Sequence, residues 1–167
     1  MTPPRAERRL RRLLAGHRAT VVGVGNVWRG DDGVGPRVAE RLAARFPSRV
    51  IDAGCVPENY VAPIIGTAPE VVVFVDAVDT GAAAGDWCVL SPSALRSRAG
   101  STHVGTLRPL ARLLAHRGIR SCVVAVEPGR LDDGAPLSPP VATSADRLVT
   151  LLGGALAPDR APEVHDA

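Results

Sequence analysis

Lysine is absent from this sequence, and all 20 of its basic residues are arginine. A Walker-type phosphate loop, a Schiff-base enzyme and a Ser-Lys dyad each need a lysine amine, so these three chemistries are excluded. Aromatic residues make up only 3% of the chain. Proteins that bind single-stranded nucleic acid stack the bases on aromatic rings, and we therefore expect no nucleic-acid partner.

Long apolar runs and paired cysteines are also missing. No stretch reaches the length of about 18 apolar residues that indicates a membrane-spanning helix, and no apolar signal-peptide core follows the arginine-rich start. The three cysteines, Cys55, Cys88 and Cys122, are widely spaced and form no C-x-x-C pair. This spacing argues against a disulfide framework and against a zinc knuckle. Together these features predict a cytoplasmic protein with no membrane partner.

The chain has 167 residues, the length of one domain, and we expect a single domain over residues 1–167 that acts as a monomer. Its net charge of +3 is concentrated in a basic extension at residues 1–18, where leucines recur at helical spacing. This pattern predicts an amphipathic helix with a solvated basic face, and a docking surface is the alternative. The polar, proline-containing residues 158–167 are predicted to form a disordered tail.

Strand-like and helix-like patterns alternate along the rest of the chain. Apolar, β-branched runs predict strands at residues 20–25, 49–53, 70–75, 86–90 and 120–126. Amphipathic or proline-initiated segments predict helices at residues 34–46, 57–62 or 57–65, 92–96, 106–116 and 141–156. This alternation predicts an α/β fold of the phosphorylase/hydrolase-like kind. Its three-layer sandwich would hold a twisted, largely parallel five-stranded sheet flanked by helices.

Two adjacent acids, Asp31 and Asp32, occupy the predicted loop between the first strand and its helix. Gly23 and Gly25 begin the G-x-G-x-x-G pattern of dinucleotide-binding loops, but Trp28 stands where the third glycine is needed. Two carboxylates would also repel a pyrophosphate, so a nucleotide-binding module is the weakest functional alternative. We expect one of the two acids to cap the following helix, which leaves the other for a cation or a proton.

Asp32, Asp76 and His103 form the candidate site. Asp76 begins the predicted loop after the third strand, and in a flavodoxin-like strand order the first and third strands are neighbours, so both acids face one crevice. His103 precedes a later helix and can reach the same crevice. Two carboxylates and an imidazole would accept a borderline ion such as Ni²⁺ or Zn²⁺. Each residue also has a structural alternative: a turn or helix cap for Asp76, and a solvated position for His103.

Short motifs along the chain resemble those of the hydrogenase maturation endopeptidases, the proteases that trim the C-terminal extension from the large subunit of nickel–iron hydrogenases. The motifs are GVGN at residues 23–26, GDDGVG at 30–35, DAG at 52–54, PEN at 57–59, VDA at 75–77 and TH at 102–103. Their order and spacing agree with the family over residues 20–155. The basic residues 1–18 and the loop near residues 132–136 depart from the family pattern, and both could encode partner choice.

The resemblance implies that Asp32, Asp76 and His103 bind a metal and take part in catalysis. The nickel would arrive with the large-subunit precursor, held by the precursor's cysteines, and zinc or cadmium could substitute for it. The implied reaction is cleavage of the precursor after nickel insertion, with the water activated either by the metal or by a carboxylate base. The alternative is an assembly factor that binds nickel or the precursor without cutting. Cys55 as a nucleophile is a weaker alternative, because no neighbour in the sequence would lower its pKa.

Overall fold

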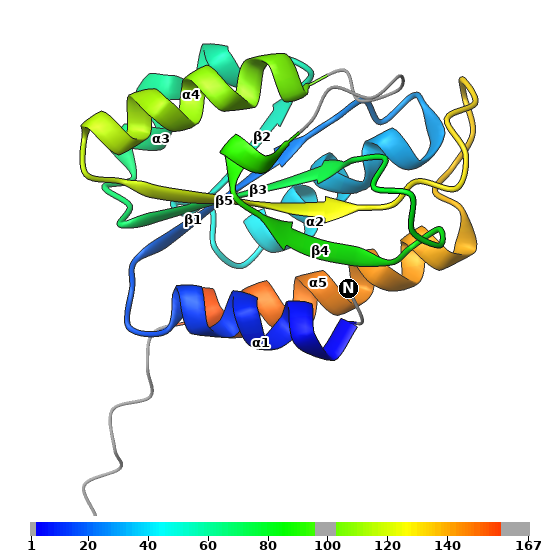
Figure 1. Ribbon diagram of the computed structural model, residues 1–167, viewed down its shortest axis with the longest axis horizontal. Helices are drawn as coiled ribbons and strands as arrows, with labels where there is room; N and C mark the ends of the chain where they lie inside the picture. The colour runs from blue at the N-terminus through cyan, green and yellow to red at the C-terminus, as the bar shows by residue number, and fades with distance from the viewer. Residues whose placement is uncertain (1–2, 96–102, 158–167) are drawn as a thin grey trace, which may run out of the picture.

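The computed structural model describes residues 3–95 and 103–157, so the predicted disordered tail and the threonine of the TH motif lie outside the described residues. The strands are β1 (Ala19–Val24), β2 (Val50–Gly54), β3 (Val71–Ala77), β4 (Trp87–Leu90) and β5 (Arg120–Val126). The helices are α1 (Pro3–Leu14), α2 (Val34–Ala43), α3 (Val61–Gly66), α4 (Val104–His116) and α5 (Pro139–Leu156) (Figure 1). Short 3-10 helices are η1 (Gly30–Gly33), η2 (Pro57–Tyr60) and η3 (Pro92–Ala94).

The five strands form one sheet in the order β2-β1-β3-β5-β4. Strand β1 pairs in parallel with β2 and β3, and β3 pairs in parallel with β5. Strand β4, at the edge next to β5, pairs with β5 in the antiparallel direction. The predicted fold class is therefore confirmed, as is the predicted neighbourhood of the first and third strands. The carboxyl ends of β1 and β3 consequently meet at one edge of the sheet, which is where open α/β sheets bind ligands.

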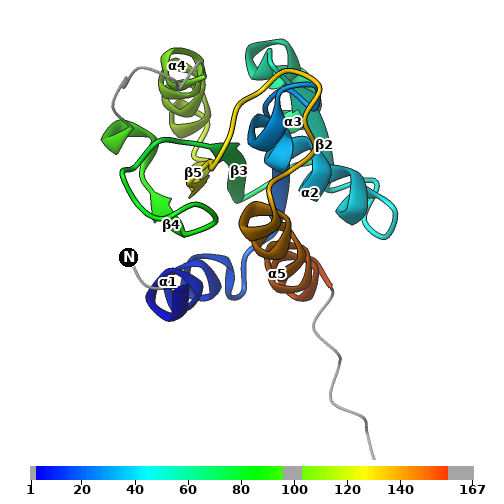
Figure 2. The same ribbon diagram turned by 90° about the vertical axis from the view of Figure 1, so that its right-hand side faces the viewer.

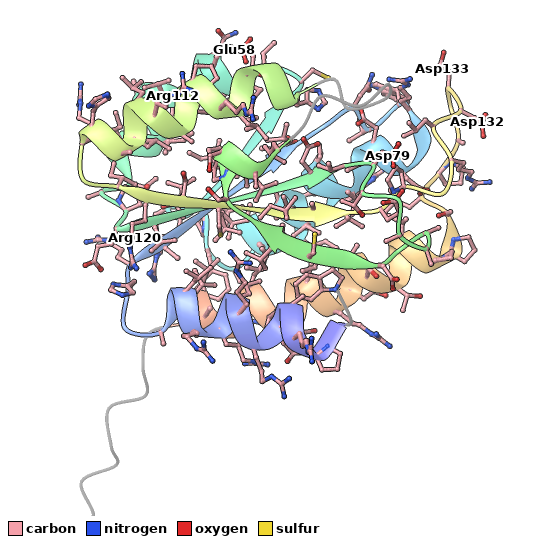
Figure 3. The ribbon with its side chains drawn as sticks, in the orientation of Figure 1. Glu58, Asp79, Arg112, Arg120, Asp132 and Asp133 are labelled. Carbon is pink, nitrogen blue, oxygen red and sulfur yellow. The ribbon has the colours of Figure 1, made fainter. Side chains whose placement is uncertain are left out.

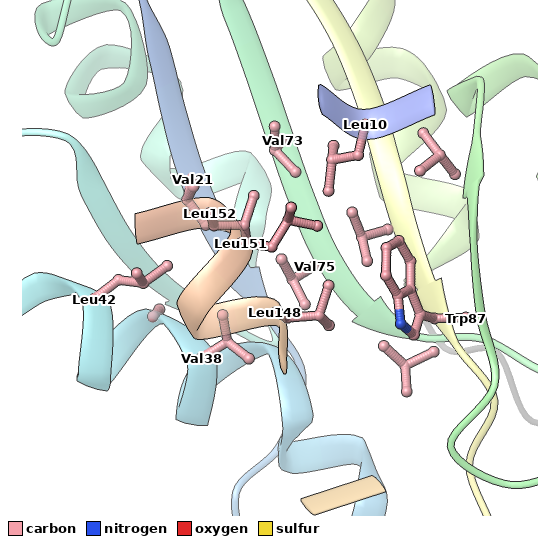
Figure 4. Close-up of a cluster of buried hydrophobic side chains, with 14 of the residues drawn as sticks. Leu10, Val21, Val38, Leu42, Val73, Val75, Trp87, Leu148, Leu151 and Leu152 are labelled. Carbon is pink, nitrogen blue, oxygen red and sulfur yellow. The ribbon is translucent and has the colours of Figure 1, made fainter. Parts of the chain in front are cut away.

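Helices cover both faces of the sheet, and the alternation of side chains along β3 shows how each face is filled (Figure 2). Val73 and Val75 belong to the apolar cluster that includes side chains of α1, α2 and α5. Val72 and Phe74 belong to the opposite cluster, which includes side chains of α3 and α4. Figure 4 shows the first cluster, in which Trp87 lies among the apolar side chains. The near-continuous apolar sequence of β3 follows from burial on both faces.

Helix α2 approaches the sheet closely because glycines stand at the contact. A Cβ atom on Gly35 would overlap the carbonyl oxygens of Val24 and Val75, and one on Gly23 would overlap the carbonyl of Gly35. These glycines therefore serve close packing between the helix and the strands. That packing places η1, just before α2, at the carboxyl ends of β1 and β3.

Helix α1 is part of the packed structure. Its apolar residues Ala6, Leu10 and Leu14 are at most 4% exposed and pack within the same cluster as α5. The arginines on its other face are exposed to solvent, as the amphipathic pattern predicts. A docking role for that basic face stays a prediction. Within residues 3–95 and 103–157, no helix has the length and apolar character needed to cross a membrane.

Several boundaries differ from the predicted ones. Helix α2 ends at Ala43, before the predicted end at residue 46, and a proline follows at residue 47. Strand β3 continues to Ala77 because its last residues keep pairing with β5. Helix α5 begins at Pro139, two residues earlier than predicted, since proline fits the first turn of a helix.

Candidate metal centre

Asp32 is held at the end of β1 by the turn that precedes it. Its Oδ2 accepts a hydrogen bond from the backbone N–H of Asn26 at 3.0 Å, and its side chain is nearly buried. Gly25 adopts a φ of 137°, and a Cβ atom there would overlap the carbonyl oxygen of Asp32. The GVGN motif thus shapes the backbone around this carboxylate. The sequence did not predict that Asn26 holds Asp32, because the donor is a backbone N–H group, which nearly every residue type has.

Asp31 has a structural role that the sequence analysis did not predict. Neither acid caps α2, whose N-cap is Gly33 and makes no side-chain capping bond, so the capping prediction is wrong. The carboxylate of Asp31 instead accepts hydrogen bonds from the backbone N–H of Gly129 and Arg130 and from the backbone N–H and hydroxyl of Ser138, at 2.6–2.9 Å. Asp31 therefore joins η1 to the loop between β5 and α5.

Asp76 lies within β3 and not in the loop after it, which corrects the predicted position. Its side chain is fully buried, and both of its carboxylate oxygens lack a hydrogen-bond partner among the residues that the structure describes. Burial raises the pKa of Asp76 to about 6 from its ordinary value of 3.8; the neighbouring His103 opposes this rise and Asp32 adds to it. A turn or cap role for Asp76 is thus wrong, because such a role would satisfy its oxygens.

His103 is the N-cap residue of α4, and its carbonyl accepts the backbone N–H of Thr106 and of Leu107 at 3.0 and 3.1 Å. The imidazole is 5% exposed, which rules out the solvated alternative. Its Nδ1 lies 3.4 Å from Oδ1 of Asp76. The Asp76 carboxylate raises the pKa of this imidazole against the lowering effect of burial. A metal that binds the imidazole nitrogen therefore competes with a proton for it.

Asp32, Asp76 and His103 converge, as the sequence predicts. One carboxylate oxygen from each acid and one nitrogen of the imidazole lie within 4.8 Å of one another, and all three residues are buried. Unpartnered buried carboxylate oxygens are costly, and a cation between them would supply the missing partner. The donor set of two oxygens and one nitrogen fits a borderline divalent ion. Binding of a metal by these residues stays a prediction.

Cys55 lies at the rim of this site, where its Sγ donates a weak hydrogen bond to the carbonyl of Gly25 at 3.6 Å. Its pKa is raised, mainly by burial and further by the negative charges of Asp32 and Asp76. A nucleophilic cysteine needs a lowered pKa. The structure therefore argues against Cys55 as a nucleophile.

Comparison with known proteins gives one consistent result. A family model described as hydrogenase maturation protease matches residues 36–154. The chain is 41% identical over 71 residues to the hydrogenase 3 maturation protease of Escherichia coli K12, an alignment that covers 41% of this chain and 46% of that protein. It is 30% identical over 141 residues to the hydrogenase expression/formation protein HupD of Rhodobacter capsulatus, covering 77% and 66%. The chain thus spans about half the length of the first of these relatives.

Solved structures agree with this result. The nickel–iron hydrogenase maturation protease HycI from Thermococcus kodakarensis superposes with a TM-score of 0.80 at 32% identity, covering 89% of this chain and 98% of that one. The endopeptidase HycI from Escherichia coli gives a TM-score of 0.70 at 26% identity, covering 82% and 90%. The similarity therefore extends over most of this chain.

Proposed function

The chain belongs to the hydrogenase maturation protease family, and from this premise we propose that it is the endopeptidase that removes the C-terminal extension of a nickel–iron hydrogenase large-subunit precursor. We further propose that it cuts only after nickel has been inserted. Asp32, Asp76 and His103 would recognise the nickel that the precursor carries. The metal is therefore part of the substrate in this proposal.

The observation that supports this proposal is the fully buried Asp76, whose two oxygens have no hydrogen-bond partner in the described part of the chain. A carboxylate in this state gains most from a cation that arrives from outside. Thiolates of the precursor would hold the nickel, and the three side chains would complete its coordination on docking. Cleavage would then depend on metal insertion, because an empty precursor offers nothing for the three residues to bind.

Peptide hydrolysis at this site needs a polarised carbonyl and an activated water. Nickel in the docked precursor would polarise the carbonyl as a Lewis acid. Asp76 would accept the proton of the water on the carboxylate oxygen that does not bind the metal, as a general base. This assignment gives the aspartate a catalytic role besides metal recognition.

The decisive test compares nickel-loaded and nickel-free forms of the large-subunit precursor from the same organism. After incubation with the protein, mass spectrometry should show loss of the extension from the loaded form only. Cleavage of the nickel-free precursor would overturn the nickel requirement. Stable binding of the loaded precursor with no change in its mass would overturn the protease and indicate a non-cleaving assembly factor.

Variants of the three residues test their assignment. We expect Asp32→Ala, Asp76→Ala and His103→Ala each to reduce cleavage by about 100- to 1,000-fold, the scale of losing a group that acts in the transition state. The matched controls are His116→Ala, which removes an exposed histidine at the far end of α4, and Asp146→Ala, which removes an exposed acid on α5. Both should cleave at the wild-type rate. Wild-type cleavage by His103→Ala would remove that residue from the mechanism.

Three further expectations belong to the same proposal. Zinc or cadmium should bind the free protein at Asp32, Asp76 and His103 as a surrogate for nickel, and isothermal titration should show a proton released on binding, since the pKa of His103 is raised. We also propose that the reaction takes place in the cytoplasm. All three cysteines are free, and the cytoplasm is a compartment that keeps cysteines reduced. A single copy of the chain is proposed to act on each precursor.

A further inference from the structure

Exposed apolar side chains gather around the candidate metal centre. Among the described residues, four large hydrophobic side chains are exposed: Val27, Trp28, Val56 and Leu113. Single exposed apolar residues are ordinary on a protein surface. Here, however, Val27 and Trp28 lie in the loop after β1 and Val56 lies in the loop after β2, whereas Leu113 lies on α4. We call Val27, Trp28 and Val56 the apolar rim.

The loops that carry the apolar rim are joined to one another and to the metal centre. The backbone N–H of Gly25 donates to the carbonyl of Gly54 at 2.9 Å, which ties the loop after β1 to the loop after β2. Asn26, whose N–H holds Asp32, also accepts the backbone N–H of Trp28 on its side-chain oxygen at 2.9 Å. The rim is therefore continuous with the site that the proposed reaction uses.

Trp28 is the largest member of the rim and is 76% exposed, whereas Trp87 is 5% exposed within the core. Its backbone is nevertheless fixed on both sides. The N–H of Gly134 donates to the carbonyl of Trp28 at 2.6 Å, and Arg29 forms an isolated β-bridge with Asp133. A tryptophan displayed on a fixed backbone loses little conformational freedom on binding, which is the property of an interface anchor.

Acidic side chains stand next to this anchor. Asp132 and Asp133 are exposed in the loop that the Gly134 bond joins to Trp28. Figure 3 shows both at the same end of the molecule as Asp79, with Arg120 at the opposite end. Arg29 and Arg130 lie beside these carboxylates, so the charged groups around the rim are of both signs and the apolar side chains are its distinguishing feature.

We propose that Trp28 and the apolar rim dock the hydrogenase large-subunit precursor, with Trp28 inserted into an apolar pocket of the precursor. The inference rests on the proposed function, because it names the surface through which that substrate reaches Asp32, Asp76 and His103. Docking would bury the rim and close the metal centre at the same time.

The two tryptophans of the chain allow a direct test with the whole protein. Labelled with 5-fluorotryptophan, it should give two ¹⁹F resonances, and the Trp28→Phe variant identifies the one from Trp28. Addition of the unlabelled precursor should shift the Trp28 resonance and abolish its H₂O/D₂O isotope shift, while Trp87 keeps its environment. An unchanged isotope shift for Trp28 in a precursor-saturated sample would overturn the inference.

Kinetics separate docking from chemistry. Trp28→Ala should raise the KM for the loaded precursor roughly 10-fold or more, with kcat changed less than about 3-fold, because an anchor contributes to binding in the ground state and the transition state alike. Leu113→Ala removes the exposed apolar side chain outside the rim and should leave both constants unchanged. A Trp28→Ala loss confined to kcat would contradict docking.

The docking surface and the protease activity can fail independently of each other. Cleavage of the loaded precursor with an unmoved Trp28 resonance would leave the protease standing and remove the docking surface. Burial of Trp28 in a complex whose precursor keeps its full mass would support the docking surface and overturn the protease activity.

Discussion

At the scale of single residues, the two adjacent acids show how neighbours in sequence take different roles. Asp31 accepts four hydrogen bonds from the loop before α5, whereas Asp32 accepts one from Asn26 and faces the metal centre. Asp76 is the extreme case, because its buried oxygens accept no well-formed hydrogen bond and its charged neighbour is the His103 imidazole, whose Nδ1 lies 3.4 Å from Oδ1. The site therefore holds an arrangement that costs stability in the free protein.

That cost predicts that Asp76→Asn stabilises the protein at neutral pH. The pKa of Asp76 is about 6 when folded and near 3.8 when unfolded, so the folded state retains a proton that the unfolded state releases. The contribution of this carboxyl to stability therefore falls as pH rises from about 4 to about 6 and stays low above that. We expect Asp76→Asn to raise the free energy of unfolding by about 1–2 kcal/mol at pH 7.

Urea unfolding at several pH values measures this effect. The gain from Asp76→Asn should shrink toward zero near pH 4, where the native carboxyl is already protonated. Asp146→Asn, at an exposed carboxylate on α5, is the control and should show no comparable gain. A variant less stable than wild type at pH 7 would mean that the Asp76 carboxylate is satisfied in the free protein.

At the scale of elements, the contact of η1 with the loop between β5 and α5 shapes one side of the site. Four donors from that loop point at one carboxylate, which only accepts hydrogen bonds. The same loop meets the chain near Trp28 through Arg29 and Asp133. The position of η1, and with it that of Asp32, depends on this contact.

Replacement of Asp31 by asparagine should therefore be costly. One amide oxygen cannot accept all four hydrogen bonds, and the amide N–H₂ would face other donors, so we expect a loss of about 2–4 kcal/mol in the free energy of unfolding. Urea denaturation measures this loss, and cleavage of the loaded precursor should slow as Asp32 shifts. A loss below about 0.5 kcal/mol, the scale of a surface substitution, would show that the contact is dispensable.

At the scale of the whole molecule, the basic residues 1–18 include a helix that belongs to the core. Leu10 is fully buried among side chains of β3, β4 and α5, although the sequence marks this region chiefly by its charge (Figure 4). The arginines of α1 lie on the outer face, opposite the packed side. Both apolar clusters must therefore form for the sheet to be covered on its two faces.

We accordingly expect Leu10→Ala to destabilise the entire fold by about 2–5 kcal/mol, as for other buried leucines, in a single cooperative transition. Arg8→Ala, on the exposed face of the same helix, should change stability by less than about 0.5 kcal/mol. Thermal unfolding followed by circular dichroism compares the two. A Leu10→Ala protein with the melting temperature of the wild type would show that the packing of α1 contributes little to the stability of the fold.

The sequence by itself determined the fold class, the strand set and the three candidate residues. Apolar periodicity acts locally, so the positions of β1 and of most of β3 could be predicted from the chain alone, whereas the close approach of α2 to the sheet at Gly35 was seen only in the structure. The short motifs identified the family before any coordinate was known, and the comparisons confirm it.

Only the tertiary structure decided what each side chain does. The pairing of β3 with β5 extended β3 past Asp76, and the distant loop before α5 supplied the donors that occupy Asp31. Both contacts join residues far apart in sequence, and hydrogen bonds from backbone N–H groups do not depend on residue type. The tertiary structure therefore determines which acid has its hydrogen bonds satisfied, which buried acid accepts none, and which tryptophan is exposed.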